Sequence, residues 1–411
     1  MLDGKVDEYN PWEPRHVHAL VIAAWGAFAV AAAMIGAVVL HVASQAHLVG
    51  EWQASQLFIS YEYGFVRRGL PGEVLALLTD RNPGSGAVAT AAVLLAFAAL
   101  LAWSFLGFVV LKRIGAGWPR LLAAANLVAS PFTVSLAIID IGRYDGVGLV
   151  ALAVLVGVSE RARPSVVCAV GAACVTVATA TAEILFAVVG PIAVLAWWHA
   201  SRATMTRRAA LSSVLVVGPG AMIALASFVL LPPEAVINQF LADALQVRPD
   251  IRQGPYANAV SALAQGVERV GAGIFETAVA TLMFETVLFA SCYGAAVWLL
   301  WRLFGRPSRS LFEVAAIGFA CVALIFTVLG IDYRRWWALA FAGVVAAVAL
   351  LPGSRPPRSD IAQAKARWVI VALLIVSVAA QALSVSPLGL DKGLRAITDS
   401  APLLNATSTG R

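Results

Sequence analysis

The sequence predicts an all-α protein, a polytopic transmembrane helical bundle of about 11 spans in a single membrane domain that covers residues 1–411. Three observations predict it. Hydrophobic residues make up 60% of the chain and charged residues only 13%, well below the share in a soluble domain. Apolar stretches of about 20 residues recur along the whole chain. Arginine and lysine clusters alternate along it as cytoplasmic loops do.

The apolar runs give the order of the spans, whose expected centres lie near residues 31, 99, 130, 151, 173, 191, 220, 294, 320, 344 and 376. Every second loop is rich in arginine, for example 202–208 and 302–309. The positive-inside rule places these loops in the cytoplasm. The N-terminal segment 1–17 then lies inside and the tail 386–411 outside. We expect a multi-pass protein of a bacterial plasma (inner) membrane.

Two of the expected outer loops are long, 44–85 and 232–272. The first contains an acidic-aromatic segment at Glu51 and a string that runs from Tyr61 to Gly72 with the letters YEYGFVRRGLPG. The apolar residues of this loop have roughly helical spacing. We therefore expect one or two amphipathic helices that lie on the membrane surface.

Three other outer turns are too short to be solvated loops. The segment between Arg120 and Glu160 suffices for only two spans of about 20 residues, so the turn 140–146 lies at the membrane boundary or dips into it. The same argument applies to the turn around Glu183 and to the turn 330–337. A charge at the centre of a span costs on the order of 2.5–3.5 kcal/mol and persists when it is paired or faces a polar cavity.

Two interpretations of these charges are open, ion-paired helix ends or the rim of a polar site. Within the turn 140–146, Asp140 and Asp145 are close enough in sequence to pair with Arg143, and the turn 330–337 offers similar pairs. Glu183 fits equally a desolvated carboxylate suited to proton exchange and an acid placed at the start of a returning helix. An ionisable residue inside the membrane is a functional hypothesis by default.

Carboxylates and arginines that gather on one membrane face suit an anionic lipid substrate. Arginine forms bidentate hydrogen bonds to phosphate, and a carboxylate can take the proton of a sugar hydroxyl. The candidate catalytic carboxylates are Glu62, Asp140, Asp145 and Glu183. The candidate substrate-binding residues are Glu51, Tyr61, Tyr63, Arg67, Arg68, Arg143, Tyr144, Asp332, Arg334 and Arg335.

The layout resembles the membrane glycosyltransferases of the GT-C type, which have many spans and a first outer loop that carries an acidic residue. In this sequence the matching acids are Glu51 and Glu62. The resemblance implies a polyprenyl-phosphate sugar donor and transfer of a hexose or pentose to a glycan or lipid acceptor of the cell envelope on the outer face. The implied partners are membrane lipids, the lipid-linked sugar and the glycan acceptor.

The strings YEYGFVRRGL, GRYD and DYRRW also resemble a group of uncharacterised bacterial polytopic membrane proteins. Three other functions stay open: a polysaccharide polymerase, a transporter or flippase of lipid-linked or anionic substrates, and a non-catalytic assembly subunit. We expect no metal and no other cofactor, because no histidine pair has zinc-helix spacing and no nucleotide-binding loop is evident. We expect no nucleic-acid partner, since the basic excess follows from topology.

Overall fold

The computed structural model describes residues 56–62, 65–66, 68–79, 85–114, 120, 123–124, 126–127, 130, 132, 143–201, 207–230, 232–247, 279–303, 309–329 and 333–351. Within these residues the regular structure is helical. The helices are α3 (Leu70–Leu78), α4 (Ser85–Arg113), α6 (Asp145–Ser159), α7 (Pro164–Thr181), the 3₁₀ turn η2 (Glu183–Leu185), α8 (Phe186–Ser201), α9 (Arg207–Val229), α10 (Glu234–Val247), α13 (Val279–Leu303), α14 (Arg309–Leu329) and α15 (Tyr333–Leu350).

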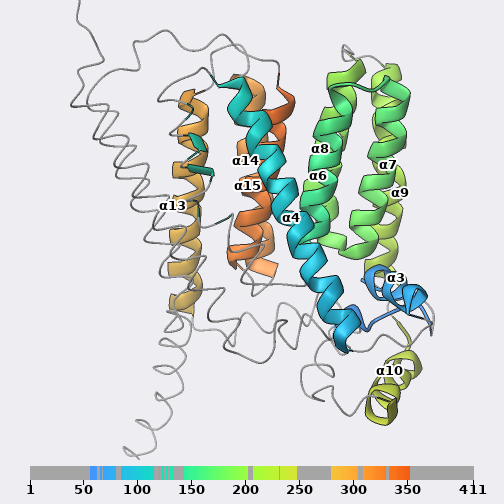
Figure 1. Ribbon diagram of the computed structural model, residues 1–411. Helices are drawn as coiled ribbons and strands as arrows, with labels where there is room; N and C mark the ends of the chain where they lie inside the picture. Colours follow the sequence, from blue (N-terminus) through green and yellow to red (C-terminus); the bar gives the residue numbers. More distant parts are fainter. Residues whose placement is uncertain are drawn as a thin grey trace, which may run out of the picture.

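Most of these helices stand side by side and nearly parallel, as Figure 1 shows, whereas the short helices α3 and α10 lie at one end of the bundle. Three helical stretches are long and apolar enough to cross a membrane, namely Gly86–Arg113, Pro164–Thr181 and Glu183–Ser201. Five shorter apolar helices accompany them: Asp145–Ser159, Leu211–Ser227, Thr286–Trp301, Leu311–Thr327 and Arg335–Leu350. The predicted all-helical class is thus observed, and the number and orientation of the spans stay predictions.

Helix α15 is the central helix of the bundle. It packs against α4, α6, α8, α13 and α14. Every residue from Trp337 to Leu351 is buried, and most of them are alanine or valine. A helix that is apolar on all sides belongs in a protein core or in a membrane, and here neighbouring helices cover it. At Gly343 an added Cβ would lie 2.7 Å from the Phe319 ring, so α14 approaches α15 closely at a residue that has no side chain.

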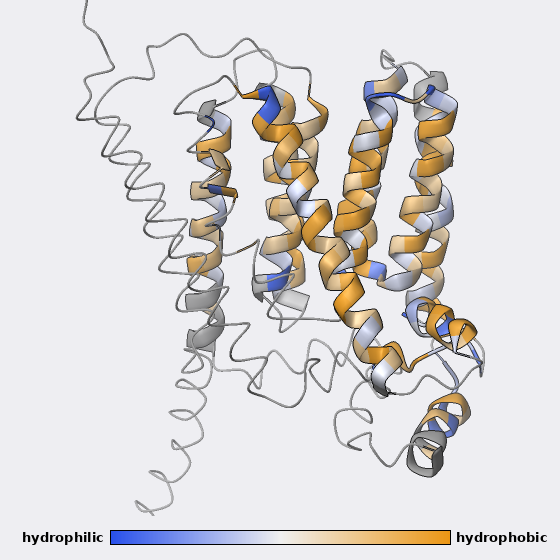
Figure 2. Cartoon of the chain, in the orientation of Figure 1, coloured by the Kyte–Doolittle hydropathy of each residue, from blue (hydrophilic) through white to orange (hydrophobic). Residues whose placement is uncertain are grey.

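The outer helices expose apolar side chains along their length. Helices α4, α9 and α14 carry most of them, for example Leu94, Phe108, Leu215, Val314 and Ile317. Figure 2 shows hydrophobic residues distributed over almost the entire height of the parallel helices. Such extended apolar surfaces are not tolerated in water but match the hydrocarbon interior of a bilayer. The surface therefore indicates helices in contact with lipid.

The turn between α7 and α8 is one of the short turns predicted from the sequence. Helix α7 starts with Pro164 after an extended Arg163, which suits the fixed φ of proline at the first helical position. It ends at Thr181, and Ala182 turns the chain in an extended conformation (φ −156°, ψ 120°). The 3₁₀ turn η2 then leads directly into α8. This reversal leaves Glu183 buried at the end of the helical hairpin.

Candidate functional site

Four segments that are far apart in the sequence bring charged residues to one end of the bundle, the lower end in Figure 1. They are the loop 56–69 that precedes α3, the start of α6, the turn η2 and the start of α15. Each of two ion pairs joins two of these segments. Arg68 binds Glu183, and Arg335 binds Asp145. We call these four residues the paired-charge cluster.

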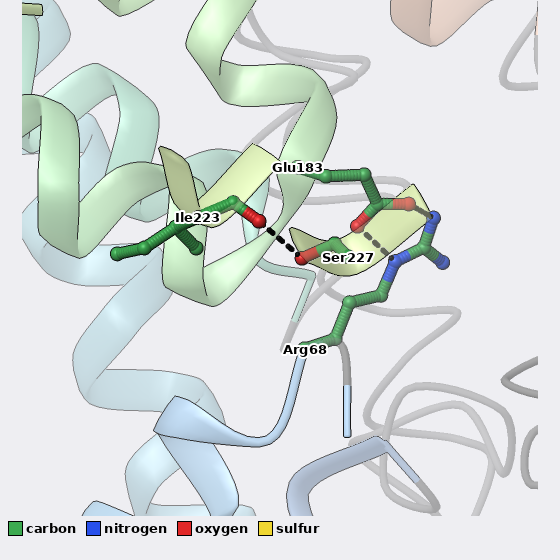
Figure 3. Close-up of polar contacts among 4 residues, drawn as sticks. All are labelled: Arg68, Glu183, Ile223 and Ser227. Carbon is green, nitrogen blue, oxygen red and sulfur yellow. Dashed lines mark hydrogen bonds and ion pairs between the residues drawn. The ribbon is translucent and has the colours of Figure 1, made fainter. Parts of the chain in front are cut away.

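The Arg68–Glu183 pair is bidentate. The Nε and Nη2 atoms of Arg68 donate to Oε2 and Oε1 of Glu183 at 3.0 and 2.6 Å. Side-chain exposure is 27% for the arginine and 7% for the carboxylate. Figure 3 shows the guanidinium lying across the carboxylate next to Ser227 of α9, whose own hydroxyl donates to the Ile223 carbonyl oxygen at 2.9 Å. Both oxygens of Glu183 are thus engaged by a charge-assisted fork.

The loop 56–69 holds Arg68 in a strained conformation. Its φ of 63° lies in the left-handed region, which costs a residue with a side chain roughly 1–2 kcal/mol. The next residue, Gly69, lies so close to Tyr61 that an added Cβ would be 2.6 Å from the ring carbon Cε1. The Tyr61 amide donates to Oε2 of Glu73 in α3 at 2.9 Å. Several tight contacts therefore oppose the strain and fix the position of the guanidinium.

The Arg335–Asp145 pair joins α15 to α6. Arg335 Nε donates to Asp145 Oδ2 at 2.5 Å, and the guanidinium carbon lies 4.9 Å from the centroid of the Trp336 ring. Asp145 is 1% exposed and is the first residue of α6, where the helix dipole favours a carboxylate. The sequence suggested a partner within its own turn, Arg143. The structure instead joins Asp145 to a helix that begins almost 190 residues later.

Some buried polar atoms at this end have no hydrogen-bond partner among the described residues. They include Asp145 Oδ1 and the indole Nε1 atoms of Trp336 and Trp337. Buried polar groups in native proteins nearly always bind protein, water or a ligand. The cluster therefore retains capacity for an additional polar group.

Tyr144 links the two pairs to the loop. Its hydroxyl donates to the carbonyl oxygen of Gln56 at 2.7 Å, and its side chain is buried.

The pKa of the Arg68 guanidinium is raised, chiefly by the negative charge of Glu183; burial and the positive charge of Arg335 act in the opposite direction. The two arginines are therefore near enough to interact. The arrangement is one electrostatic cluster and not two isolated pairs.

The structure brings six of the predicted site residues into this region: Tyr61, Arg68, Tyr144, Asp145, Glu183 and Arg335. Arg143 directly precedes Tyr144, and its carbonyl oxygen accepts the amide of Gly146 at 3.4 Å. Glu62 is exposed on the loop. Of Arg334 only the backbone is described. The remaining predicted residues lie outside the described part of the chain; they are Glu51, Tyr63, Arg67, Asp140 and Asp332.

Sequence reasoning missed two contributors, Gln56 and Glu73, and the neighbouring Ser227. Gln56 contributes only its backbone carbonyl, which no side-chain pattern reveals. Glu73 stands in the first turn of α3. The sequence did contain a signal for it, because a proline followed by an acid marks the start of a helix. Among the described residues, no three or more His, Cys, Asp or Glu side chains lie close enough to hold a metal ion.

A second ion pair network lies at the opposite end of the bundle. Arg113, at the end of α4, donates to Glu160 Oε1 at 2.9 Å and to the carbonyl oxygen of Leu351. It joins the ends of α4, α6 and α15. The bundle thus separates two groups of charges, because the arginine-rich loop after α6 lies at this end and the paired-charge cluster at the other.

Parallel apolar helices with a lipid-facing surface define a class, the α-helical integral membrane proteins. More specifically, the chain belongs to the family described as Uncharacterised membrane protein Rv1490, whose model matches residues 22–270. The matched part includes Arg68, Asp145 and Glu183 but not Arg335. No curated protein and no solved structure matches the chain. The sequence-based resemblance to uncharacterised membrane proteins is therefore confirmed.

Proposed function

We propose that this chain is an integral membrane glycosyltransferase of the GT-C type. It transfers a sugar from a polyprenyl-phosphate donor to a glycan or lipid acceptor of the cell envelope, on the non-cytoplasmic face of the plasma membrane. One observation carries the proposal: four segments converge to place two arginines and two carboxylates in one cluster at the end of a lipid-embedded bundle. Ion-paired helix ends that serve stability alone need no such convergence.

The charges of the cluster suit a lipid phosphate. A polyprenyl-phosphate sugar carries its negative charge at the level of the head groups while its chain lies in the hydrocarbon. Arg68 lies in the loop just before α3 and Arg335 in the first turn of α15, both at one end of the bundle. Guanidinium groups remain charged at every physiological pH and match the geometry of phosphate oxygens.

The geometry favours Asp145 over Glu183 as the general base. Both oxygens of Glu183 are held by Arg68, whereas Asp145 uses only Oδ2 for Arg335. Its Oδ1 has no partner among the described residues and has lone pairs that can accept a proton. Glu183 then acts as a positioning residue that orients Arg68.

The proposed reaction is a direct displacement. The acceptor hydroxyl oxygen attacks the anomeric carbon and forms the new glycosidic bond while Asp145 Oδ1 takes the hydroxyl proton. The bond between the anomeric carbon and the phosphate oxygen breaks, and its electron pair leaves with the polyprenyl phosphate. Arg68 stabilises this leaving group electrostatically. No electron is exchanged with another molecule, so the step requires only donor and acceptor.

The separation of charges along the bundle supports the proposed side of the membrane. Lys112, Arg113, Arg161 and Arg163 belong to the end opposite the paired-charge cluster. If that basic end is cytoplasmic, as the positive-inside rule predicts, the cluster faces outward. Polyprenyl-phosphate sugars are the donors available there, since soluble nucleotide sugars are confined to the cytoplasm.

The test is transfer of label by the purified protein in liposomes. Donors are radiolabelled polyprenyl-phosphate hexoses and pentoses, and acceptors are extracted envelope glycans and glycolipids. We expect transfer by the wild type and a loss of about 100-fold or more in Asp145→Asn, which keeps the shape of the side chain. The matched control is Glu160→Gln, which removes a paired carboxylate at the opposite end and leaves transfer unchanged.

Three results would overturn the proposal. Full activity of Asp145→Asn removes the proposed base. Incorporation from polyprenyl-diphosphate-linked chains but not from polyprenyl-phosphate sugars identifies a polymerase. Movement of a lipid-linked sugar across the liposome membrane without any glycosidic product identifies a flippase.

A further inference from the structure

The loop before α3 carries an aromatic pair beside the paired-charge cluster. The rings of Tyr61 and Phe65 are stacked, with centroids 6.1 Å apart and planes inclined by 8°. The Phe65 side chain is 43% exposed and that of Tyr61 is half-buried. Phe65 precedes Arg68 by three positions in the sequence. The reaction described above has no role for this pair.

Polar groups accompany the rings in the loop. Glu62, between the two aromatic residues in sequence, is exposed, and its backbone amide donates to Ser60 Oγ at 3.4 Å. The Tyr61 hydroxyl stays protonated, because burial and the negative charge of Glu73 raise its pKa. A flat apolar surface next to a carboxylate and a phenol is unfavourable for an acyl chain, which offers no hydrogen bonds. It suits a molecule with one apolar face and a rim of hydroxyl groups.

A pyranose or furanose ring has this character. Its C–H bonds on one face carry partial positive charge, which the negative face of an aromatic ring attracts. Its hydroxyl groups donate to carboxylates and accept from a phenol. Exposed aromatic residues therefore bind sugars by stacking, and neighbouring carboxylates select the sugar by hydrogen bonding.

Contacts within the loop and with α3 hold Tyr61 in place. The Tyr61 amide is bonded to Glu73, its ring packs against Gly69, and the Gly69 amide donates to the Val66 carbonyl oxygen at 3.3 Å. A preformed surface loses little conformational entropy on binding. Gly69, against which the Tyr61 ring lies, directly follows Arg68 in the chain. The aromatic pair is thus continuous with the charged cluster.

From this geometry we infer that Tyr61, Glu62 and Phe65 form the binding subsite for the sugar ring of a glycan acceptor. The inference rests on the proposed glycosyltransferase function. It assigns Glu62 to acceptor binding, where the sequence suggested a catalytic carboxylate.

The test measures acceptor binding separately from transfer. The purified protein in detergent is titrated with soluble gluco-, manno-, galacto- and arabino-oligosaccharides, and binding is followed by saturation-transfer difference NMR. We expect at least one of these sugars to bind, and binding to fall about five- to tenfold in Phe65→Ala. Phe65→Trp retains binding, because the larger ring still stacks. Phe97→Ala, which removes an exposed ring from the lipid-facing side of α4, leaves binding unchanged.

Kinetics and cross-linking complete the test. In the transfer assay Phe65→Ala and Glu62→Gln raise the KM for the acceptor and leave the KM for the donor unchanged. With p-benzoylphenylalanine in place of Phe65, photocross-linking yields a glycan adduct. Equal binding by wild type and Phe65→Ala, or an adduct with lipid acyl chains only, overturns the inference.

The outcome also separates this inference from the proposed function. Oligosaccharide binding that depends on Phe65, without transfer from any donor, supports the subsite and refutes the glycosyltransferase. Transfer that requires Asp145 but has the same acceptor KM in Phe65→Ala supports the glycosyltransferase and refutes the subsite.

Discussion

Replacing Arg68 by alanine should destabilise the protein by about 2–3 kcal/mol. Breaking a fully buried ion pair by removal of one partner costs roughly 3–5 kcal/mol, because the other charge is left buried. Arg68 is 27% exposed and Glu183 7%, so solvent reduces that figure. The amide of Glu183→Gln is neutral and still accepts a hydrogen bond, so this variant should lose less, about 1–2 kcal/mol.

The left-handed backbone at Arg68 distinguishes this prediction from a generic loss of an ion pair. Alanine at φ 63° retains a strain of roughly 1–2 kcal/mol that glycine lacks. Glycine gains unfolded-state entropy worth about 0.4–1 kcal/mol, which offsets part of the difference. Arg68→Gly should therefore be more stable than Arg68→Ala by about 0.5–1 kcal/mol, although both lose the same ion pair.

The assay is unfolding of the purified protein in mixed micelles with increasing sodium dodecyl sulfate, followed by circular dichroism. The free energy of unfolding is compared among wild type, both Arg68 variants, Glu183→Gln and the double variant Arg68→Ala/Glu183→Gln. The double variant should be more stable than the sum of the single effects predicts, by about 1–2 kcal/mol. Additive effects, or equal stability of Arg68→Ala and Arg68→Gly, would refute the reasoning.

Three further predictions concern the packing of the bundle and its loop. Gly72→Ala should prevent normal folding of the loop, because the added Cβ would lie 1.9 Å from a backbone carbonyl oxygen. The control is Gly294→Ala, whose Cβ would have no atom within 4 Å and which should be neutral or stabilising by about 0.5–1 kcal/mol. Melting temperatures of the two variants measure both effects. Tyr144→Phe should cost about 1–2 kcal/mol, since a buried carbonyl oxygen loses its donor, and limited proteolysis should detect a loosened loop. Arg113→Gln should lower the melting temperature without changing transfer activity, because its bonds with Glu160 and α15 lie at the other end.

Each of these has a contradicting result. A wild-type melting temperature for Gly72→Ala would mean that the loop does not pack against α3 as described. Proteolysis of Tyr144→Phe at the wild-type rate would show that the hydroxyl does not hold the loop. A loss of transfer in Arg113→Gln with unchanged stability would place chemistry at the opposite end.

The sequence predicted the positions of helices well because bilayer thickness sets the length of an apolar run. Eight expected span centres, near residues 99, 151, 173, 191, 220, 294, 320 and 344, fall within α4, α6, α7, α8, α9, α13, α14 and α15. The region around residue 130 is described only at a few positions, and the centres near 31 and 376 lie outside the described residues.

The pairing of the charges could not be predicted in the same way. Counting residues indicated that Asp145 and Glu183 stand at helix ends, because two spans left no room for a loop. Their partners depend on which helices are neighbours, and α6 meets α15 across most of the chain. Local spacing instead suggested pairs within single turns. The left-handed backbone at Arg68 was also invisible, since arginine has no preference for that conformation.

The burial of α15 has a consequence for biogenesis. A membrane protein is inserted from its N-terminus as it is synthesised, so α4, α6 and α8 enter the bilayer before the helix that packs against all three. Until then Asp145 lacks the guanidinium of Arg335, and the apolar faces destined for α15 contact lipid or one another. Ribosome-bound chains that stop before residue 333 should therefore expose a transient surface that a membrane insertase or chaperone can recognise.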